Sequence, residues 1–457
     1  MNIVKFTWRN LWVKPLNTGL SVLLIALGVA LVTMLSQLSR QMNQRLDRNI
    51  KDINMVIGAK GSPLQSILSA VYHVDVPTGN IPLREAITLS KIKKLVRKAI
   101  PMALGDGHKG FRIVGTTHEY TKLYEAKVQE GKLWEKTMEA TIGHYVQQKT
   151  NLKIGDTFAG AHGLTGDDMH LHADHLYKVV GILEKTGTVL DQLILTNVQS
   201  VWAVHAEHDD HEEETETPAQ NDAHAHDAHD HDAHDHDAHA HDTHAHDHDA
   251  HALNIPLLGG AVEVDTTNKM LTNVLIQYQR DSSGTPSAMA DIMLARIMDE
   301  HLPSLGYAYP LRERDKLLNS IGIGFDLLKY LAYLFMFVSA LSIFISLYTN
   351  MKERRYEMAL MRVMGSSAAK VSMHVLLEGM LIAALGGLLG ILVAHSGMSL
   401  LSSLLQAEYR YQFEGFFSFY WAELVIFLFA LFLGALASLL PAYQAYKTNI
   451  SSTLSEG

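Results

Sequence analysis

The chain of 457 residues contains no cysteine. Disulfide bonds and thiolate metal ligands are therefore excluded, whereas the redox state of the compartment stays open. The P-loop pattern G-x-x-x-x-G-K-S/T is also missing, because the glycine-rich residues 58–62 (GAKGS) have the wrong spacing. Catalytic triads, paired catalytic carboxylates and nucleic-acid-binding patches are not recognisable either. We therefore expect a chain that does not bind ATP through a P-loop and is not itself an enzyme.

One stretch lacks positive charge altogether. Residues 205–251, called the His-rich tract below, contain 15 His, 11 Asp and 5 Glu but neither Lys nor Arg. The carboxylates give the tract a formal charge of −16, against −10 for the whole chain, so the remaining sequence is basic. Such a composition buries too little apolar surface to fold, which predicts a disordered loop inserted into the chain.

Two clusters of histidine are candidate metal sites, because imidazole binds zinc, copper and nickel and carboxylates complete such sites. Residues 168–175 (DMHLHADH) place His170 and His172 on one side of an extended chain, where His175 can reach them; a solvated loop is the alternative. The tract candidates are His224, His226, His229, His231, His234, His236, His239, His241, His244, His246, His248 and His251. Repetition favours metal capture or buffering over one rigid catalytic site. A tolerated low-complexity insertion and a pH-responsive loop remain alternatives.

Four apolar segments reach the length of about 20 residues that a membrane-spanning helix requires: 16–36, 325–348, 371–395 and 417–440. Positive charge marks the cytoplasmic side of a membrane, and it concentrates in the link at residues 349–370. We therefore expect residues 1–15, 349–370 and 441–457 inside, and residues 37–324 and 396–416 outside.

The large outer segment combines helical and strand patterns. Helices are predicted at 87–100 and 287–301, and a helical stalk at 312–320 leads into the second span. Strands are predicted at 111–116, 177–183, 193–196 and 273–279. The predicted fold class is an α-helical membrane protein with four transmembrane helices in a 1+3 arrangement, plus an α+β extracytoplasmic domain between helices 1 and 2.

Three strings in the C-terminal third carry a family resemblance. They are residues 353–370 (ERRYEMALMRVMGSSAAK), 377–390 (LEGMLIAALGGLLG) and 440–447 (LPAYQAYK). In order and position they resemble the permease domain of bacterial ABC systems such as the macrolide exporter, the lipoprotein-releasing permeases and the cell-division permease. Residues 130–134 (EGKLW), 143–157 and 179–195 resemble the periplasmic domain of that family. The His-rich tract and the absence of a fused nucleotide-binding domain depart from it.

The resemblance implies a multi-pass protein of the bacterial inner (plasma) membrane with both termini in the cytoplasm. It implies an ABC ATPase subunit on a separate chain and a second permease, either another copy or a paralogue. A periplasmic adaptor or metal-binding protein is a further expected partner, and nucleic acid is not. We expect no tightly bound cofactor, only zinc, nickel or copper on the tract.

The same resemblance places the ATPase contact on a cytoplasmic helix at about 351–364. The expected coupling residues are Arg354, Arg355, Glu357, Met358, Met361, Arg362 and Gly365. Apolar Met358, Leu360, Met361 and Val363 are expected to dock, while the charged residues pair with the ATPase; charges that only fix topology are the alternative. Glu378, a polar residue in the third span, is expected to bond a neighbouring helix, with a proton or ion relay as alternative. The glycines at 386, 387 and 390 suit a dimer seam or a contact within the chain.

The leading interpretation is a permease subunit that couples ATP hydrolysis to a periplasmic conformational change and is tied to zinc or another divalent metal through the tract. The stalks at 40–51 and 312–320 are expected to transmit the motion. Two alternatives remain open: release or export of a lipoprotein, peptide or lipid with metal only as a regulator, and a signal relay to a periplasmic partner that transports nothing. Fold-level similarity does not fix the substrate.

Overall fold

The computed structural model describes residues 7–9, 11–12, 14–162, 171–205, 253–258, 260–262, 268–408 and 420–447. The chain divides into two compact units. We call residues Met1–Arg45 with Lys316–Gly457 the helical unit, and residues Leu46–Asp315 the α+β unit. Each unit has hydrophobic cores of its own.

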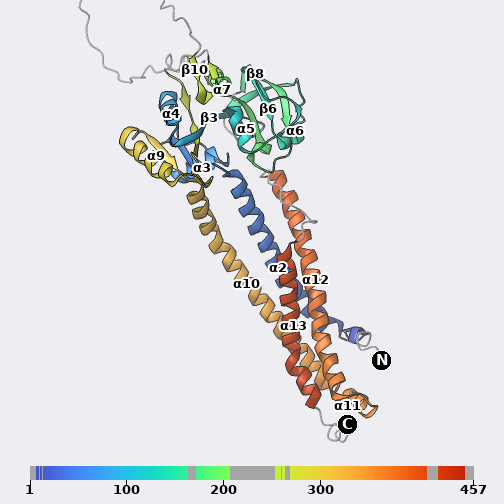
Figure 1. The fold of residues 1–457 in the computed structure, drawn as a ribbon. Helices are drawn as coiled ribbons and strands as arrows, with labels where there is room; N and C mark the ends of the chain where they lie inside the picture. Colours follow the sequence, from blue (N-terminus) through green and yellow to red (C-terminus); the bar gives the residue numbers. More distant parts are fainter. Residues whose placement is uncertain are drawn as a thin grey trace, which may run out of the picture. The chain divides into compact units, whose positions relative to one another are not determined.

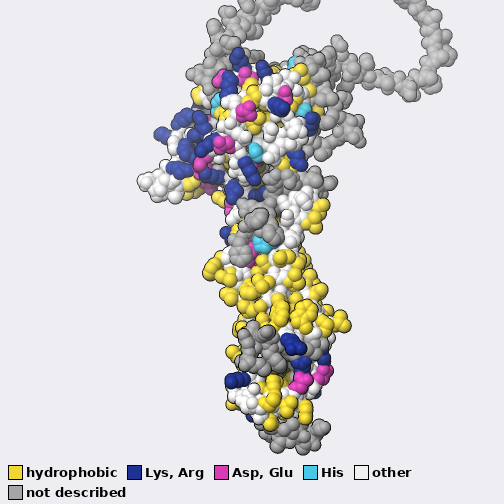
Figure 2. Space-filling model, turned by 90° about the vertical axis from the view of Figure 1, so that its right-hand side faces the viewer, with side chains coloured by type: hydrophobic (Ala, Val, Ile, Leu, Met, Phe, Trp, Pro, Cys, Tyr) yellow, Lys and Arg dark blue, Asp and Glu magenta, His cyan; other side chains and the backbone are white. Residues whose placement is uncertain are grey.

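The helical unit is built from α2 (Pro15–Asn49), α10 (Pro310–Glu353), α11 (Arg355–Val363), α12 (Ala368–Glu408) and α13 (Trp421–Lys447). Within the described residues, four helices are long and apolar enough to cross a membrane: α2, α10, α12 and α13. They run alongside one another (Figure 1), and their outer surface carries a broad band of hydrophobic side chains (Figure 2). The outer loop predicted at 396–416 is helical over its first part, because α12 continues to Glu408.

Glycines let the long helices approach closely. A Cβ at Gly28 of α2 would lie 2.8 Å from Met336 Cγ of α10, and one at Gly386 of α12 would lie 2.7 Å from Ile25 Cβ of α2. A Cβ at Gly390 would meet Ala26 O of α2 at 2.7 Å. A Cβ at Gly387 would lie 2.9 Å from Phe427 Cδ2 of α13, so all three glycines expected at a dimer seam or an internal contact serve contacts within the chain.

The α+β unit contains all the described strands and most of the short helices. The strands are β1 (Met55–Ala59), β2 (Ile81–Pro82), β3 (Val96–His108), β4 (Phe111–Thr116), β5 (Val128–Gly131), β6 (Glu139–Ile142), β7 (Thr157–His162), β8 (Leu171–Leu183), β9 (Leu193–Asn197), β10 (Leu253–Ile255), β11 (Gly260–Val262), β12 (Met270–Leu271), β13 (Asn273–Tyr278) and β14 (Leu305–Ala308). The helices are α3 (Pro63–Ala70), α4 (Leu83–Ser90), α5 (His118–Leu123), α6 (His144–Thr150), α7 (Val198–His205) and α9 (Ala288–His301), with 3₁₀ turns η1 (Val189–Gln192) and η2 (Pro256–Leu258).

A ten-stranded sheet in the order β14-β1-β13-β3-β4-β9-β6-β8-β5 organises this unit, with β7 paired to β3 and β8. Strand β3 is long and irregular between Leu104 and Gly107, so one part of it pairs with β13 and another with β7. Helices α4, α7 and α9 pack on one core, which includes Trp202 of α7 and Leu257 of η2. The two described segments that flank the His-rich tract therefore join the same core.

The predicted fold class is confirmed: four candidate membrane helices in a 1+3 order, with an α+β domain between the first and the second. Four strands and the helix at 287–301 lie where they were predicted. The helix predicted at 87–100 is wrong, because α4 ends at Ser90 and β3 begins at Val96. Pairing of Val96 through Met102 with β13 outweighs the helical spacing of the apolar residues there.

Candidate functional site

The segment that carries the family resemblance folds as a short helix between two bends. Helix α10 ends at Glu353, and Arg354 (φ −102°, ψ 17°) leaves helical geometry before α11 begins. At the far end Gly365 has a φ of +98°, which glycine adopts without steric strain. The Ser366 N–H donates to the Met361 carbonyl at 3.0 Å and ends the helix. α11 is thus a separate element between α10 and α12.

The inward face of α11 is packed against the chain itself. Met358 is 6 % exposed and Ala359 is fully buried. Met358 shares a core with Met351, Val371, Val375 and Ala442, and Met361 packs on its edge. Burial of such a methionine typically contributes about 1.5–3 kcal/mol. The Met358 side chain thus fills a space between α11, α12 and α13, and its docking on a partner stays a prediction.

The outward face of α11 presents a different set of apolar residues. Tyr356, Leu360, Val363 and Met364 are exposed, and their spacing of four, three and one residues places them along one side of the helix. The predicted charged residues Arg355 and Glu357 are exposed as well, as is Gly365, while Arg354 and Arg362 are half-buried. The sequence prediction included Leu360 and Val363 but missed Tyr356 and Met364, which lie at the two ends of the exposed face.

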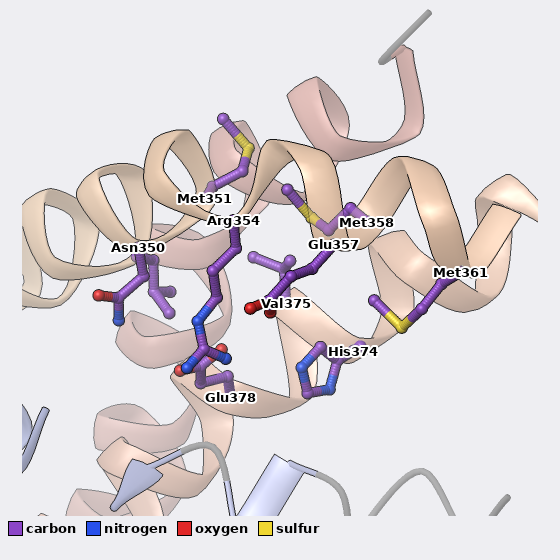
Figure 3. A pocket seen from close by; sticks show the side chains of 10 residues that line it. Asn350, Met351, Arg354, Glu357, Met358, Met361, His374, Val375 and Glu378 are labelled. Atoms are coloured by element: carbon purple, nitrogen blue, oxygen red, sulfur yellow. The ribbon is translucent and has the colours of Figure 1, made fainter. Parts of the chain in front are cut away.

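A small cavity lies beneath α11, between it and α12. Arg354 and Glu357 point toward α12, which contributes His374 and Glu378 to the lining (Figure 3). Glu378 is only 4 % exposed, so the carboxylate predicted as a polar residue of the third span lies in the interior of the helical unit, at the foot of this cavity. The arrangement brings opposite charges from the α10–α11 bend and from α12 to one place.

Two contacts tie the N-terminal segment to the same region. The Lys14 ammonium forms an ion pair with Glu353 at the end of α10. Thr7 is buried, and its hydroxyl lies 2.7 Å from His374 Nδ1 on α12. The sequence analysis did not find Thr7, since a single threonine near the N-terminus carries no recognisable pattern. The contacts connect the start of α2, the end of α10 and the start of α12.

The predicted metal ligands fall almost entirely outside the described residues. This holds for His170 and for His224 through His251, and for the side chain of His172, whose backbone lies in β8. His175 is described: its Nε2 lies 3.1 Å from the carbonyl oxygen of Ala203. Across the described ranges no group of three or more His, Cys, Asp or Glu side chains is placed to hold a metal ion. The metal sites therefore stay a prediction.

The first residue of the His-rich tract, His205, is also the last residue of α7 and is among the described residues. His205 Nε2 lies 3.5 Å from Asp106 Oδ1, and Asp106 is 2 % exposed. Burial, with a smaller contribution from the Asp106 carboxylate, raises the pKa of Tyr177 nearby. The tract thus leaves the α+β unit beside a buried carboxylate of β3.

Comparisons with known proteins match two parts of the chain to two families. Residues 18–221 match the family described as the MacB-like periplasmic core domain, and residues 330–450 match the family described as the FtsX-like permease C-terminal domain. A similar solved structure is the periplasmic region of MacB from Actinobacillus actinomycetemcomitans, at 10 % identity and a TM-score of 0.32, covering 60 % of this chain and 99 % of that one. The curated proteins gave no match.

Proposed function

The chain is an ABC-transporter permease of the MacB and FtsX type, and we propose from this that it couples ATP hydrolysis on a separate subunit to a conformational change of its periplasmic α+β unit. It is a multi-pass protein of the inner membrane. In the proposed arrangement both termini and α11 face the cytoplasm. The chain itself performs no chemistry and pairs with a second permease, either another copy or a paralogue.

The exposed face of α11 is the observation that carries the proposal. Four apolar side chains, Tyr356, Leu360, Val363 and Met364, are exposed on a helix whose other face is buried against α12 and α13. The exposed Arg355 lies beside them and supplies a charge for pairing with a partner. An apolar centre with a charged rim is the usual composition of a protein–protein interface. Since α11 follows α10 directly and is packed on α12, force applied there acts on both helices.

A link to zinc or another divalent metal is the second part of the proposal. Its support is the composition of the His-rich tract, in which imidazole and carboxylate alternate. Both flanking segments belong to the α+β unit, and the proposal puts the tract on the periplasmic side with that unit. In this proposal the tract captures metal there and exchanges it with a periplasmic adaptor or metal-binding protein.

The coupling is tested on the full-length chain purified from membranes with its ATPase. We expect Leu360→Glu combined with Val363→Glu to lower the amount of ATPase retained about tenfold or more, because charge is introduced at two residues that the proposed interface covers. Ser367→Glu is the matched control, since Ser367 is exposed in the bend that follows α11. Retention of the ATPase by the double variant at the control level contradicts the docking role of α11.

A further inference from the structure

A cluster of three buried polar side chains, two of them ionisable, lies at the other end of the membrane helices from α11. Gln37 Nε2 of α2 donates to Glu423 Oε1 of α13 at 2.7 Å, and His395 Nε2 of α12 lies 2.9 Å from Glu423 Oε2. Gln37 Nε2 and His395 Nε2 are 3.3 Å apart. All three are buried: Gln37 is 3 % exposed, Glu423 is 2 % exposed and His395 is 6 % exposed. One carboxylate therefore joins three helices through both of its oxygens.

Local structure places each member of the cluster. Gln37 is on a buried stripe of α2 that also holds Thr33 and Gln41, one helical turn to either side. Glu423 is in the first turn of α13, where the helix dipole stabilises a negative charge. Beside it the Arg40 guanidinium of α2 stacks on the Tyr420 ring at 4.4 Å. The cluster is thus built from several independent features of α2 and α13.

Stability alone does not account for this cluster. Apolar residues of similar volume would pack the same three helices without the desolvation that a buried carboxylate and imidazole require. Ionisable residues inside membrane segments are rare and mark function by default. A bond to a carboxylate differs from apolar packing in being directional, so it fixes the position of one helix along another.

The helix that the cluster holds, α2, is one of the two long helices that continue into the α+β unit. α2 runs without a break from Pro15 to Asn49, and the α+β unit begins at Leu46. Lower down, α2 is held to α12 by the close contacts of Gly386 and Gly390. We propose that Gln37, His395 and Glu423 form a clamp that fixes α2 to α12 and α13, so that movement of α12 and α13 is passed to α2. This role rests on the proposed coupling function; the three are positioning residues that act through their mutual bonds.

The test uses substitutions that keep shape and change the bonds. Glu423→Gln removes the charge, and Gln37→Leu removes the donor to Glu423. The exchange of Gln37→Glu with Glu423→Gln restores one carboxylate and one amide across the same contact. The readout is the nucleotide-dependent change in protease sensitivity of the α+β unit in the full permease–ATPase complex. We expect the nucleotide-dependent difference in protease sensitivity to be about tenfold or more smaller in each single variant, while ATP hydrolysis continues. The exchanged pair should restore this difference.

Thiol pairs report the helix positions, since the natural chain has no cysteine. A Cβ at Gly397 would lie 3.7 Å from Met34 Sδ, so Met34→Cys with Gly397→Cys reports the α2–α12 contact near the clamp. Ser21→Cys with Ser342→Cys is the control for folding, because these hydroxyls are 3.0 Å apart between α2 and α10. With nucleotide trapped, we expect a short thiol crosslinker to join 34 and 397 about tenfold less in Glu423→Gln than in the unsubstituted background, and to join 21 and 342 equally.

The outcomes separate the clamp from the coupling function. If the unsubstituted complex shows a nucleotide-dependent change that survives undiminished in Glu423→Gln and Gln37→Leu, the clamp is overturned and the coupling function stands. If the unsubstituted complex shows no such change, the coupling function fails and the clamp with it. If the single variants do not fold, the exchanged pair decides. The clamp is overturned if the exchanged pair is folded, as judged by the 21–342 crosslink, but shows no nucleotide-dependent change in protease sensitivity.

Discussion

At the scale of single residues, His73 shows how burial sets a pH dependence in the α+β unit. Its Nε2 lies 2.8 Å from the Tyr120 hydroxyl, and burial, with a smaller effect of the Arg112 guanidinium, lowers the pKa of His73 to about 3. The ordinary pKa of histidine is 6.5. Between these values the unfolded chain takes up a proton that the folded chain does not. The stabilising contribution is therefore complete above pH 6.5 and declines as the pH falls toward 3.

We expect His73→Asn to remove this dependence. Asparagine tolerates the positive φ of 55° at this position and carries no titrating group. Between pH 6 and pH 4 the free energy of unfolding of the natural α+β unit should fall by up to about 1.4 kcal/mol per pH unit more steeply than that of the variant. Denaturant titration of the full-length protein, followed by hydrogen exchange of its strand amides, measures both slopes. His301→Asn, at an exposed position, is the control, and equal slopes for His73→Asn and the natural chain contradict the expectation.

At the scale of elements, the two faces of α11 have separate roles that substitutions can distinguish. Met358→Ala empties part of the core between α11, α12 and α13, and such truncations typically cost about 2–5 kcal/mol. We expect faster hydrogen exchange of the α11 amides in the isolated permease. Leu360→Ala shortens an exposed side chain and should leave that exchange unchanged while weakening ATPase retention. Equal exchange rates in the two variants would show that α11 is not held by its inward face.

The α11 faces also show what a sequence does not reveal. Runs of about 20 apolar residues predicted the four membrane helices, since length and hydropathy are local properties. Met358 rather than Leu360 is buried because it packs against Val375 and Ala442, and only the folded bundle brings these residues to α11. The clamp is hidden for the same reason: Gln37, His395 and Glu423 are single polar residues in separate spans. At 87–100 a helical spacing was overruled by strand pairing, another long-range effect.

At the scale of the whole molecule, the His-rich tract lies in the sequence between two segments that share one core. Trp202 precedes it and Leu257 follows it, and both pack in the same cluster of the α+β unit. Removal of residues 222–251 leaves these flanks and a connecting segment in place. We expect the shortened chain to keep the hydrogen-exchange protection of β3 and β13, and a loss of protection there would show that the tract supports the fold.

The same deletion decides whether metal belongs to the function. We compare cellular zinc, and growth under chelation and zinc excess, in the natural strain, a strain without the gene and a strain with the shortened chain. A fourth strain, with the histidines of 222–251 replaced by glutamine, keeps the length and the acidic charge of the tract but removes the imidazoles. We expect all three altered strains to share a zinc defect, because imidazole is the part of the tract that prefers zinc over harder cations.

The pattern among these strains separates the three functions. A zinc defect in the glutamine variant equal to that of the full deletion makes metal traffic the function, with the tract as its metal-capturing part. A defect unrelated to zinc in the full deletion, with normal growth of both tract variants, contradicts the metal link. Coupling through α11 then serves release or export of a lipoprotein, peptide or lipid, or a relay to a periplasmic partner. The relay is favoured if a partner protein is recovered with the α+β unit and the activity of that partner rises with ATP hydrolysis. Export does not require that ATP hydrolysis control the activity of a partner protein.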